Sequence, residues 1–350
     1  MIEDAPAVAN LYQRFFRNTK APAAESLVNA FLTVFFRHPW ADPELPSLVY
    51  AQSDGAVQGF IGIYPVPLCF RGRRIRAAFS GNLMVDAVRQ DPLAGARLLR
   101  SFLSGRQDLS LTETANQVSL GMFRKLGGQV VVNRSLDWIR IFRPATWLAS
   151  VGAGRISWLG PTRVVAIAVD HLAARALPPP PDVSLCSGND VAPAELSDVV
   201  REISSSFALH PDFNGAVLSF LLEHAVGSEE YGRPLARIVR NLRGQPIGGY
   251  LAHGRKNETL RVLQVFASPA NADLVVNDLL ARAAEMGAAA VTGRMQPELV
   301  ASVLSASSMF IYRGATVAVA RDAELLAAVH GSDNFLNGLA GETWVSPSLF

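Results

Sequence analysis

The chain consists of two similar halves on either side of four consecutive prolines, and this repeat constrains the fold more than any other feature. Pro178–Pro181 cannot continue a helix and favour an extended connector. In the first half, residues 48–64 alternate apolar and polar positions on both sides of Asp54-Gly55, a pair typical of a hairpin turn. Residues 237–254 repeat this pattern around an Arg-Gly pair in the second half.

Later segments repeat at a similar offset of roughly 180 to 190 residues. A strand expected at 83–86 and a helix expected at 96–103 match a strand at 263–266 and a helix at 274–284. An internal duplication is the interpretation we favour. Two unrelated α+β domains are the alternative.

Each half is predicted to start with two helices, continue with the hairpin, and end with strand, loop, helix, strand and helix. Strands joined first by a hairpin and then by helices predict a mixed sheet with helices on both faces. The expected fold class is therefore α/β, in the mixed α+β sense: two domains, each with a mixed, mostly antiparallel central sheet flanked by helices. The expected boundaries are 1–150 and 184–326 for the domains, 151–183 for a connector with the proline-rich linker, and 327–350 for a C-terminal tail.

Composition excludes several classes of protein. Of 350 residues, 49% are apolar and 18% charged, which allows sizeable cores and argues against disorder. A net charge of +2 without a dense basic run makes nucleic acid an unexpected partner. Cys69 and Cys186 lie in different halves, so neither a disulfide framework nor a metal site is expected. Without a signal peptide or an apolar run long enough for a transmembrane segment, the sequence predicts a soluble cytoplasmic protein.

Four motifs resemble, in order and spacing, those of the GNAT N-acyltransferase superfamily. Residues 3–16 resemble its opening helix, and residues 54–64 its central hairpin. Residues 83–103, "LMVDAVRQDPLAGARLLRSFL", resemble its acyl-CoA signature of strand, loop and helix. Residues 113–129, "ETANQVSLGMFRKLGGQ", resemble its last motif. The resemblance covers nearly the whole chain and implies two tandem domains, although the strand that usually precedes the first helix has no counterpart at the start of the chain.

The loop before the helix at 96–103 is the expected pyrophosphate site. The first turn of a helix presents several backbone N–H groups and the positive end of the helix dipole, and small residues allow a phosphate to approach. Leu93 stands where the family has a glycine, and Asp91 is unfavourable beside a phosphate unless it caps the helix. An ordinary Asp-Pro helix start is the alternative. The resemblance implies acyl-CoA contacts from Gln90, Asp91, Leu93, Ala94, Gly95 and Ala96.

The corresponding loop in the second half, residues 268–273, contains a proline and an aspartate but no glycine and no basic residue. A proline removes a backbone donor and an aspartate adds negative charge. The second copy is therefore predicted to be degenerate and not to bind CoA in the family's manner.

The resemblance also implies roles for residues around the loop. The backbone of Leu83, Met84 and Val85 would bind the thioester carbonyl and the pantetheine amides. Asn116 would hold the pantetheine arm. Phe123 stands where the family often has a tyrosine that protonates the leaving thiolate, and a phenyl ring has no proton to give.

Two acidic residues are candidates for the general base. Glu113, at the end of a predicted strand, is the first choice because the family places acceptor-side groups there. Asp86, at the end of the preceding strand, is the second. A solvated strand end or a helix cap is the alternative interpretation of Glu113.

Taken together, the sequence predicts an acyl-CoA-dependent N-acyltransferase whose first domain transfers an acyl group directly from acetyl-CoA or another acyl-CoA to a small amine such as an amino sugar. A non-catalytic GNAT-like scaffold is one alternative. An aminoacyltransferase that uses aminoacyl-tRNA is another, and the modest net charge argues against it. Apolar tail residues are expected to pack on the body of the protein or on a second subunit of a homodimer; they are Phe335, Leu336, Leu339 and Trp344.

Overall fold

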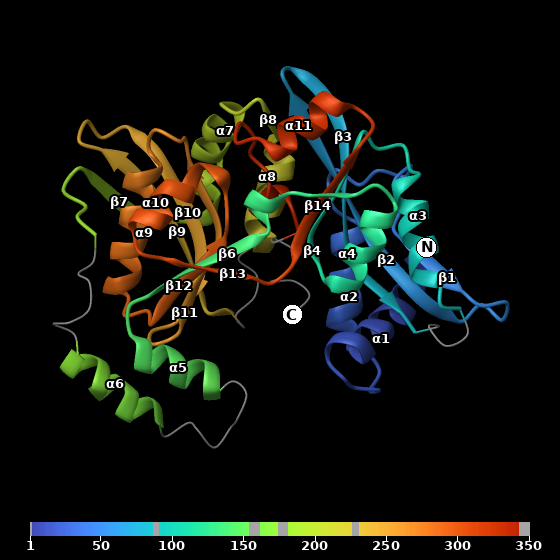
Figure 1. Cartoon of the computed structure of the whole chain (residues 1–350), viewed down its shortest axis with the longest axis horizontal. Coiled ribbons are helices and arrows are strands. Elements are labelled where there is room, and N and C mark those ends of the chain that lie inside the picture. The colour runs from blue at the N-terminus through green and yellow to red at the C-terminus, as the bar shows by residue number, and fades with distance from the viewer. Residues whose placement is uncertain (1, 87–90, 154–161, 174–180, 226–230, 343–350) are drawn as a thin grey trace. The chain divides into compact units, whose positions relative to one another are not determined.

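The computed structural model describes residues 2–86, 91–153, 162–173, 181–225 and 231–342 (Figure 1). These residues form two compact units, each built on a seven-stranded mixed sheet. Unit 1 contains Met1–Ser135, Phe207–Ala225 and Arg313–Phe350, and unit 2 contains Leu136–Ser206 and Val226–Tyr312.

The sheet of unit 1 has the order β1-β2-β3-β4-β14-β5, with β8 paired to a further stretch of β2. Its strands are β1 (Leu48–Ala51), β2 (Val57–Phe70), β3 (Arg73–Val85), β4 (Leu109–Ala115), β5 (Gln129–Val130), β8 (Leu209–Pro211) and β14 (Ala315–Ala320). Its helices are α1 (Ala5–Phe16), α2 (Glu25–Phe36), α3 (Ala94–Leu103), α4 (Gln117–Lys125), α8 (Gly215–Ala225) and α11 (Ala323–His330), with short 3-10 turns at Ile2–Asp4, Val132–Arg134 and Gly338–Ala340.

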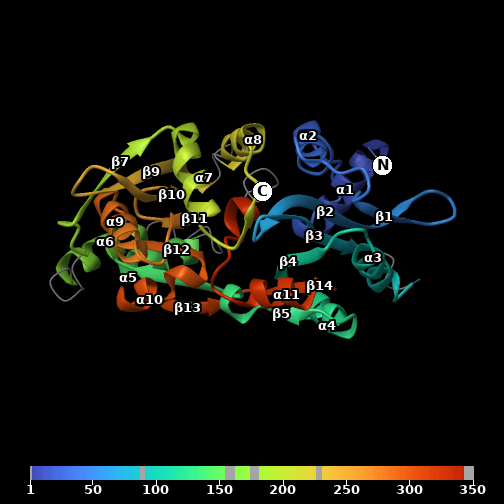
Figure 2. The same ribbon diagram turned by 90° about the horizontal axis from the view of Figure 1, so that it is seen from above.

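Strand β2 shows how the apolar pattern places helices on both faces of this sheet. Successive side chains of a strand point to opposite faces. Ile61 and Ile63 belong to the core cluster formed with α3 and α4. Phe60 and Tyr64 instead pack against Phe35 of α2, with ring centroids 5.3 Å and 4.9 Å away. In Figure 2, α1 and α2 accordingly lie on one side of the sheet and α4 on the other.

The sheet of unit 2 has the order β13-β6-β12-β11-β10-β9-β7. Its strands are β6 (Leu136–Ile141), β7 (Cys186–Val191), β9 (Arg233–Asn241), β10 (Pro246–Gly254), β11 (Thr259–Ala267), β12 (Ala290–Arg294) and β13 (Met309–Tyr312). Its helices are α5 (Pro144–Ala153), α6 (Thr162–Ala173), α7 (Ser197–Ser205), α9 (Ala272–Glu285) and α10 (Val300–Ser305), with 3-10 turns at Pro193–Leu196 and Pro297–Leu299.

The two halves of the chain exchange one strand each. β6 comes from the first half but lies between β12 and β13 of unit 2, and β14 comes from the second half but lies between β4 and β5 of unit 1 (Figure 1). The expected boundaries, 1–150 and 184–326, therefore differ from the units, which are discontinuous in sequence. Strand periodicity reports which face of a strand is buried but not which sheet receives it, so the exchange left no pattern to detect.

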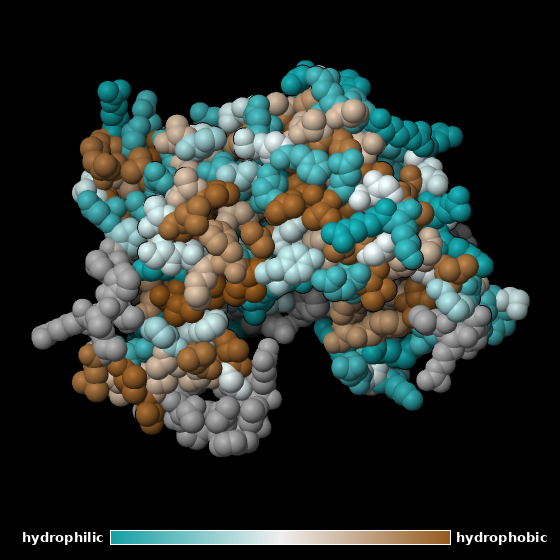
Figure 3. All heavy atoms as spheres, viewed as in Figure 1, coloured by the Kyte–Doolittle hydropathy of each residue, from teal (hydrophilic) through white to brown (hydrophobic). Residues whose placement is uncertain are grey.

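The connector expected at 151–183 also differs from the structure. It overlaps two helices, α5 and α6, which are packed against each other. Both helices carry exposed apolar side chains, and Figure 3 shows apolar atoms gathered over them. These side chains are Leu148, Val151, Val165, Val169 and Leu172. Three of the four consecutive prolines lie outside the described residues.

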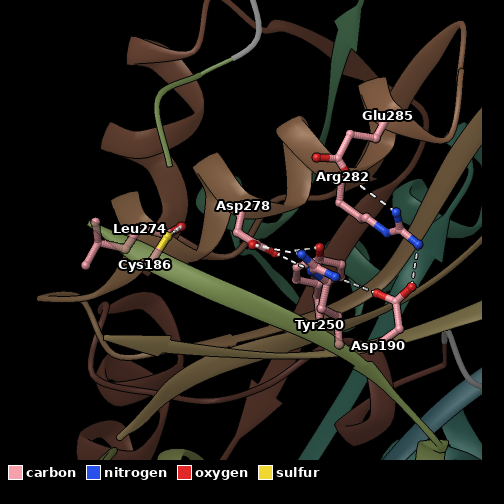
Figure 4. Close-up of polar contacts among 8 residues, drawn as sticks. Cys186, Asp190, Tyr250, Leu274, Asp278, Arg282 and Glu285 are labelled. Carbon is pink, nitrogen blue, oxygen red and sulfur yellow. Dashed lines mark hydrogen bonds and ion pairs between the residues drawn. The ribbon is translucent and has the colours of Figure 1, made fainter. Parts of the chain in front are cut away.

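An ion-pair network fastens α9 to the sheet of unit 2 (Figure 4). The buried carboxylate of Asp278, on α9, accepts hydrogen bonds from Arg237 Nε at 2.8 Å and from the Tyr250 hydroxyl at 2.8 Å. Asp190 of β7 accepts from the same Arg237 at 2.7 Å and from Arg282 of α9. The network thus joins three strands to one helix, with both carboxylates partnered.

The network makes unit 2 sensitive to acid. Burial by itself would raise the pKa of Asp190, but the hydrogen bonds from Arg237 and Arg282 outweigh it and hold that pKa below its usual value. A carboxyl whose folded-state pKa is depressed adds stability above its unfolded pKa and loses it as the pH falls through the folded value.

Gly188 is needed beside the network, because a Cβ there would lie 2.3 Å from Arg237 Nε.

We expect Asp278→Ala to lower the free energy of unfolding of unit 2 by about 3 kcal/mol, because it leaves the Arg237 Nε and the buried Tyr250 hydroxyl without their acceptor. Glu285→Ala, on the same helix, is the matched control: its exposed ion pair with Arg282 is worth under about 0.5 kcal/mol. Urea unfolding followed by fluorescence measures both. Equal effects from the two substitutions would contradict the structural role of the network.

Candidate functional site

In unit 1, the parallel strands β3 and β4 separate soon after they pair. Within the described residues they are paired only where Ala77–Phe79 lie beside Leu109–Leu111. Beyond this point β3 stays paired with β2 as far as Val85, while β4 stays paired with β14 as far as Ala115. The backbone of β3 after Phe79 therefore has no ladder partner on its β4 side, and its polar groups there are available to a ligand.

The separation coincides with a local irregularity of β3. Its register with β2 shifts between Phe60 and Gly62, and Asn82 adopts the left-handed backbone region at φ 52°. The side-chain amide nitrogen of Asn82 is buried and has no acceptor among the described residues. Tyr64 lies beside the same stretch, because a Cβ at Gly81 would stand 3.0 Å from its hydroxyl.

The carboxylate of Asp91, just before α3, has three hydrogen-bond donors around it. Its carboxylate accepts hydrogen bonds from the Tyr50 hydroxyl at 2.7 Å, from Arg97 at 2.9 Å and from the Leu93 N–H at 3.0 Å. The Tyr50 hydrogen bond is the largest cause that lowers the pKa of Asp91. The carboxylate thus caps the turn before the helix and is paired with a cation. The helix itself begins later than the alternative Asp-Pro start, at Ala94 with Leu93 at its N-cap.

The first turn of α3 keeps free donors despite this cap. Among the described residues, the backbone N–H groups of Gly95 and Ala96 have no acceptor. Gly95 is half-buried, and a Cβ there would meet Val85 at an ordinary 3.5 Å. The side chain of Leu93 is 59% exposed, so it does not fill the turn, whereas Ala94 is fully buried. Gln90 lies outside the described residues.

The remaining residues that the resemblance implied have mixed positions. Leu83 and Val85 are half-buried along the core cluster of unit 1, and Met84 is buried on β3. The Asn116 side chain accepts from the Ser119 N–H at 3.0 Å and caps α4. Phe123 is 3% exposed inside the same core cluster, so its ring serves packing.

The two candidate bases stand in contrasting surroundings. Asp86 is exposed and forms an ion pair with Arg14 of α1 at 3.1 Å. Glu113 is 2% exposed, and its Oε2 accepts the backbone N–H of Glu342 at 2.5 Å. Glu113 is therefore neither the solvated strand end nor the helix cap of the alternative interpretation, because it lies in a buried contact with the C-terminal segment.

The segment 333–342 is an integral part of unit 1. The buried Arg134 donates to the carbonyl oxygens of Leu336, at 2.7 Å, and Asn334, at 2.9 Å. Phe335 is fully buried, with its ring 5.6 Å from that of Phe207. Leu339 is also buried, and Trp344 lies outside the described residues. The described apolar residues of the tail thus pack within unit 1, which also contains β14.

This segment brings a second carboxylate to the end of β4. Oε1 of Glu342 accepts from the Glu113 N–H at 2.8 Å and from the Thr112 hydroxyl at 3.0 Å, and Oε2 accepts from the Thr114 hydroxyl at 2.8 Å. Burial, reinforced by the neighbouring charge of Glu113, raises the pKa of Glu342 to about 7. Two acidic side chains therefore share one buried site next to the separated strands.

Unit 2 closes the equivalent separation with its own side chain. β11 and β12 pair in parallel only at Thr259–Val262 beside Ala290–Gly293 within the described residues. Just beyond, the Gln296 carboxamide accepts from the Val265 N–H at 3.0 Å and donates to the Val265 carbonyl at 2.9 Å. The backbone groups that β3 leaves available are thus satisfied internally on β11.

Sequence reasoning missed both Glu342 and Gln296. A signal for Gln296 existed, because it follows Asn116 by 180 residues, which lies within the repeat offset. No signal marked Glu342, since the tail has no counterpart in the repeat.

The comparisons with known proteins concern the fold. Neither a protein-family model nor a curated protein matches the sequence. A GCN5-related N-acetyltransferase from Anabaena variabilis ATCC 29413 aligns with a TM-score of 0.57 at 12% identity, covering 90% of this chain and 70% of that one. The fold is that of the GCN5-related N-acetyltransferases.

Two further structures share this acetyltransferase fold at a TM-score of 0.53. One is a GCN5-related N-acetyltransferase from Kribbella flavida, 14% identical, with 92% of this chain and 70% of that chain covered. The other is a probable N-acyltransferase from Enterococcus faecalis V583, 12% identical, with 91% and 70% covered. The expected fold class, a mixed sheet flanked by helices in each unit, is confirmed.

Two further kinds of feature are absent from the described residues. Among the residues that the structure describes, no cluster of three or more His, Cys, Asp or Glu side chains could hold a metal ion. No helix within the described ranges is both long and apolar enough to cross a membrane.

The raised pKa of Glu342 predicts how stability depends on pH. The folded protein holds this proton more tightly than the unfolded chain, so the contribution of the protonated carboxyl is lost as the pH rises from about 4.5 to about 7. We expect the melting temperature of the wild type to fall, relative to that of Glu342→Gln, between about pH 5 and about pH 8. The exposed Glu324→Gln is the control and should run parallel to the wild type. Parallel curves for Glu342→Gln as well would contradict the assignment.

Proposed function

We propose that unit 1 is an acyl-CoA-dependent N-acyltransferase that acylates a small amine. The observation that carries the proposal is the separation of β3 from β4 beside a first turn of α3 that keeps two free N–H groups, those of Gly95 and Ala96. A strand edge with unsatisfied donors and a helix N-terminus with free N–H groups suit an extended ligand with amides, a thioester carbonyl and a pyrophosphate. The acetyltransferase fold supports this ligand class.

Different residues of unit 1 would bind different parts of the acyl-CoA. The N–H groups of Gly95 and Ala96 would bind the pyrophosphate, with Arg97 adding positive charge beside Asp91. The freed backbone of β3 and the Asn82 amide would hold the pantetheine amides and polarise the thioester carbonyl.

Glu113 would receive the proton that the amine loses. The amine nitrogen forms a bond to the acyl carbon, the carbon–sulfur bond breaks, and a proton returns to the CoA sulfur. Asp86 is the weaker candidate because it is held by Arg14 on the exposed side of β3. Phe123 donates no proton, so the leaving thiolate would take its proton from the carboxyl site or from water.

Unit 2 is proposed to have no acyl-CoA site of its own. Gln296 satisfies the backbone groups of Val265 that an acyl-CoA would need, and the loop before α9 has no glycine. The expected degeneracy of the second copy is part of this proposal.

We expect the wild type to bind acetyl-CoA in isothermal titration calorimetry and Gly95→Glu to weaken that binding by roughly tenfold or more, about 1.4 kcal/mol, because it brings volume and negative charge to the helix N-terminus. Gly95→Ala is the matched control, since a Cβ there has ordinary contact distances. Undiminished binding by Gly95→Glu would show that the phosphate loop is wrongly assigned. If neither acetyl-CoA nor longer acyl-CoAs bind at millimolar concentration, the proposed function fails.

A further inference from the structure

We propose that Glu342, carried into unit 1 by the C-terminal segment, is a positioning residue for Glu113, and that the two carboxyls work as one proton-exchanging pair in acyl transfer. This inference rests on the proposed function. It goes beyond it by making residues more than 200 positions apart one functional unit, and by adding a partner that the acetyltransferase motifs of the first half do not contain.

The geometry of the pair is reciprocal. The Glu113 N–H donates to Oε1 of Glu342 at 2.8 Å, and the Glu342 N–H donates to Oε2 of Glu113 at 2.5 Å. Each residue thus holds the other's carboxylate with its own backbone, so neither side chain can rotate without breaking a buried hydrogen bond. Thr112 and Thr114, on either side of Glu113, add two hydroxyl donors to Glu342.

The segment passes so close to Glu113 that only glycine fits at position 341. A Cβ there would lie 2.4 Å from Oε2 of Glu113 and 2.6 Å from Oε1. The approach is secured elsewhere, by Arg134 on the carbonyls of Asn334 and Leu336 and by the buried Phe335. The residues that anchor the segment, 334–336, therefore differ from those that contact Glu113, 341 and 342. Each group can be substituted without changing the other.

The electrostatic surroundings make the pair hold a proton near neutral pH. From β4, Glu113 faces Glu342; from β2, Tyr64 interacts with it; and Tyr12 of α1 interacts with Tyr64. None of these groups is a cation that would favour two ionised carboxylates. Two like charges in one buried site lose their protons in two separate steps that belong to the pair. The higher step, near the pKa of about 7 of Glu342, suits exchange with an amine.

The proton balance of the step is simple. With one proton on the pair, the ionised carboxyl accepts a second proton from the attacking amine as the carbon–nitrogen bond forms. As the carbon–sulfur bond breaks, the pair returns one proton to the CoA sulfur and recovers its starting state. No further reactant is required.

The test is the pH profile of kcat/KM for acetyl transfer to an amine that the wild type accepts. We expect Glu342→Gln to move the acid midpoint down by about one pH unit or more, because the remaining carboxyl no longer has a charged neighbour. Thr114→Val should move it up, since it removes a hydroxyl that favours the ionised form of Glu342. If Glu342 had only a structural role, these two substitutions would not shift the acid midpoint in opposite directions.

Phe335→Ala is the control for the docking of the segment. We expect it to lower the melting temperature while leaving the acid midpoint in place, because its ring packs against Phe207 and carries no ionisable group. A wild type that binds and turns over acetyl-CoA, with an acid midpoint that neither Glu342→Gln nor Thr114→Val moves, overturns this inference and leaves the proposed function standing. A wild type that neither binds acyl-CoA nor acylates any amine overturns both.

Discussion

The brief parallel pairing of β3 with β4 is the constraint on which the candidate site depends. A strand in the middle of a sheet normally satisfies its backbone on both edges, and β3 does so for only part of its length. The separation is stable because each strand keeps another partner: β2 holds β3 to Val85, and β14 holds β4 to Ala115. β14 belongs to the second half of the chain, so the shape of the site in unit 1 requires both halves.

The two units use one arrangement of strands in different ways. In unit 1 the freed edge of β3 stands beside a helix N-terminus with free donors, and a pair of carboxyls lies at the end of β4. In unit 2 a glutamine side chain bridges to β11, and a buried ion-pair network holds α9 against the sheet. The Gln296 carboxamide supplies both the acceptor and the donor that the Val265 backbone needs, so this part of β11 has no free backbone groups left for a ligand.

Local features were predictable from the sequence because neighbouring residues decide them. The hairpin turns at Asp54-Gly55 and at Arg243-Gly244 form as expected, with positive φ at both glycines. Asp91 caps the turn before α3, although the helix begins at Ala94 rather than at Pro92. The sequence pattern predicts helices at 7–16, 24–36 and 213–224, and the ends of α1, α2 and α8 differ from these by at most two residues. The site residues taken from the motifs stay predictions; for two of them the structure shows another role as well, since Asn116 caps α4 and Phe123 lies in the core.

By itself the sequence determined many of the helices and strands, since these follow from periodicity and turn chemistry over short stretches. Its motifs also resembled those of the acetyltransferase fold, which the solved structures confirm, while the internal duplication stays a prediction. Only the tertiary structure decided that β6 and β14 change sheets, that Gln296 closes one strand separation, and that Glu342 meets Glu113. These depend on contacts between residues far apart in the chain, and a strand or a tail carries no mark of its distant partner. The buried carboxyl pair, assembled from β4 and the C-terminal segment, exists only once the chain has folded.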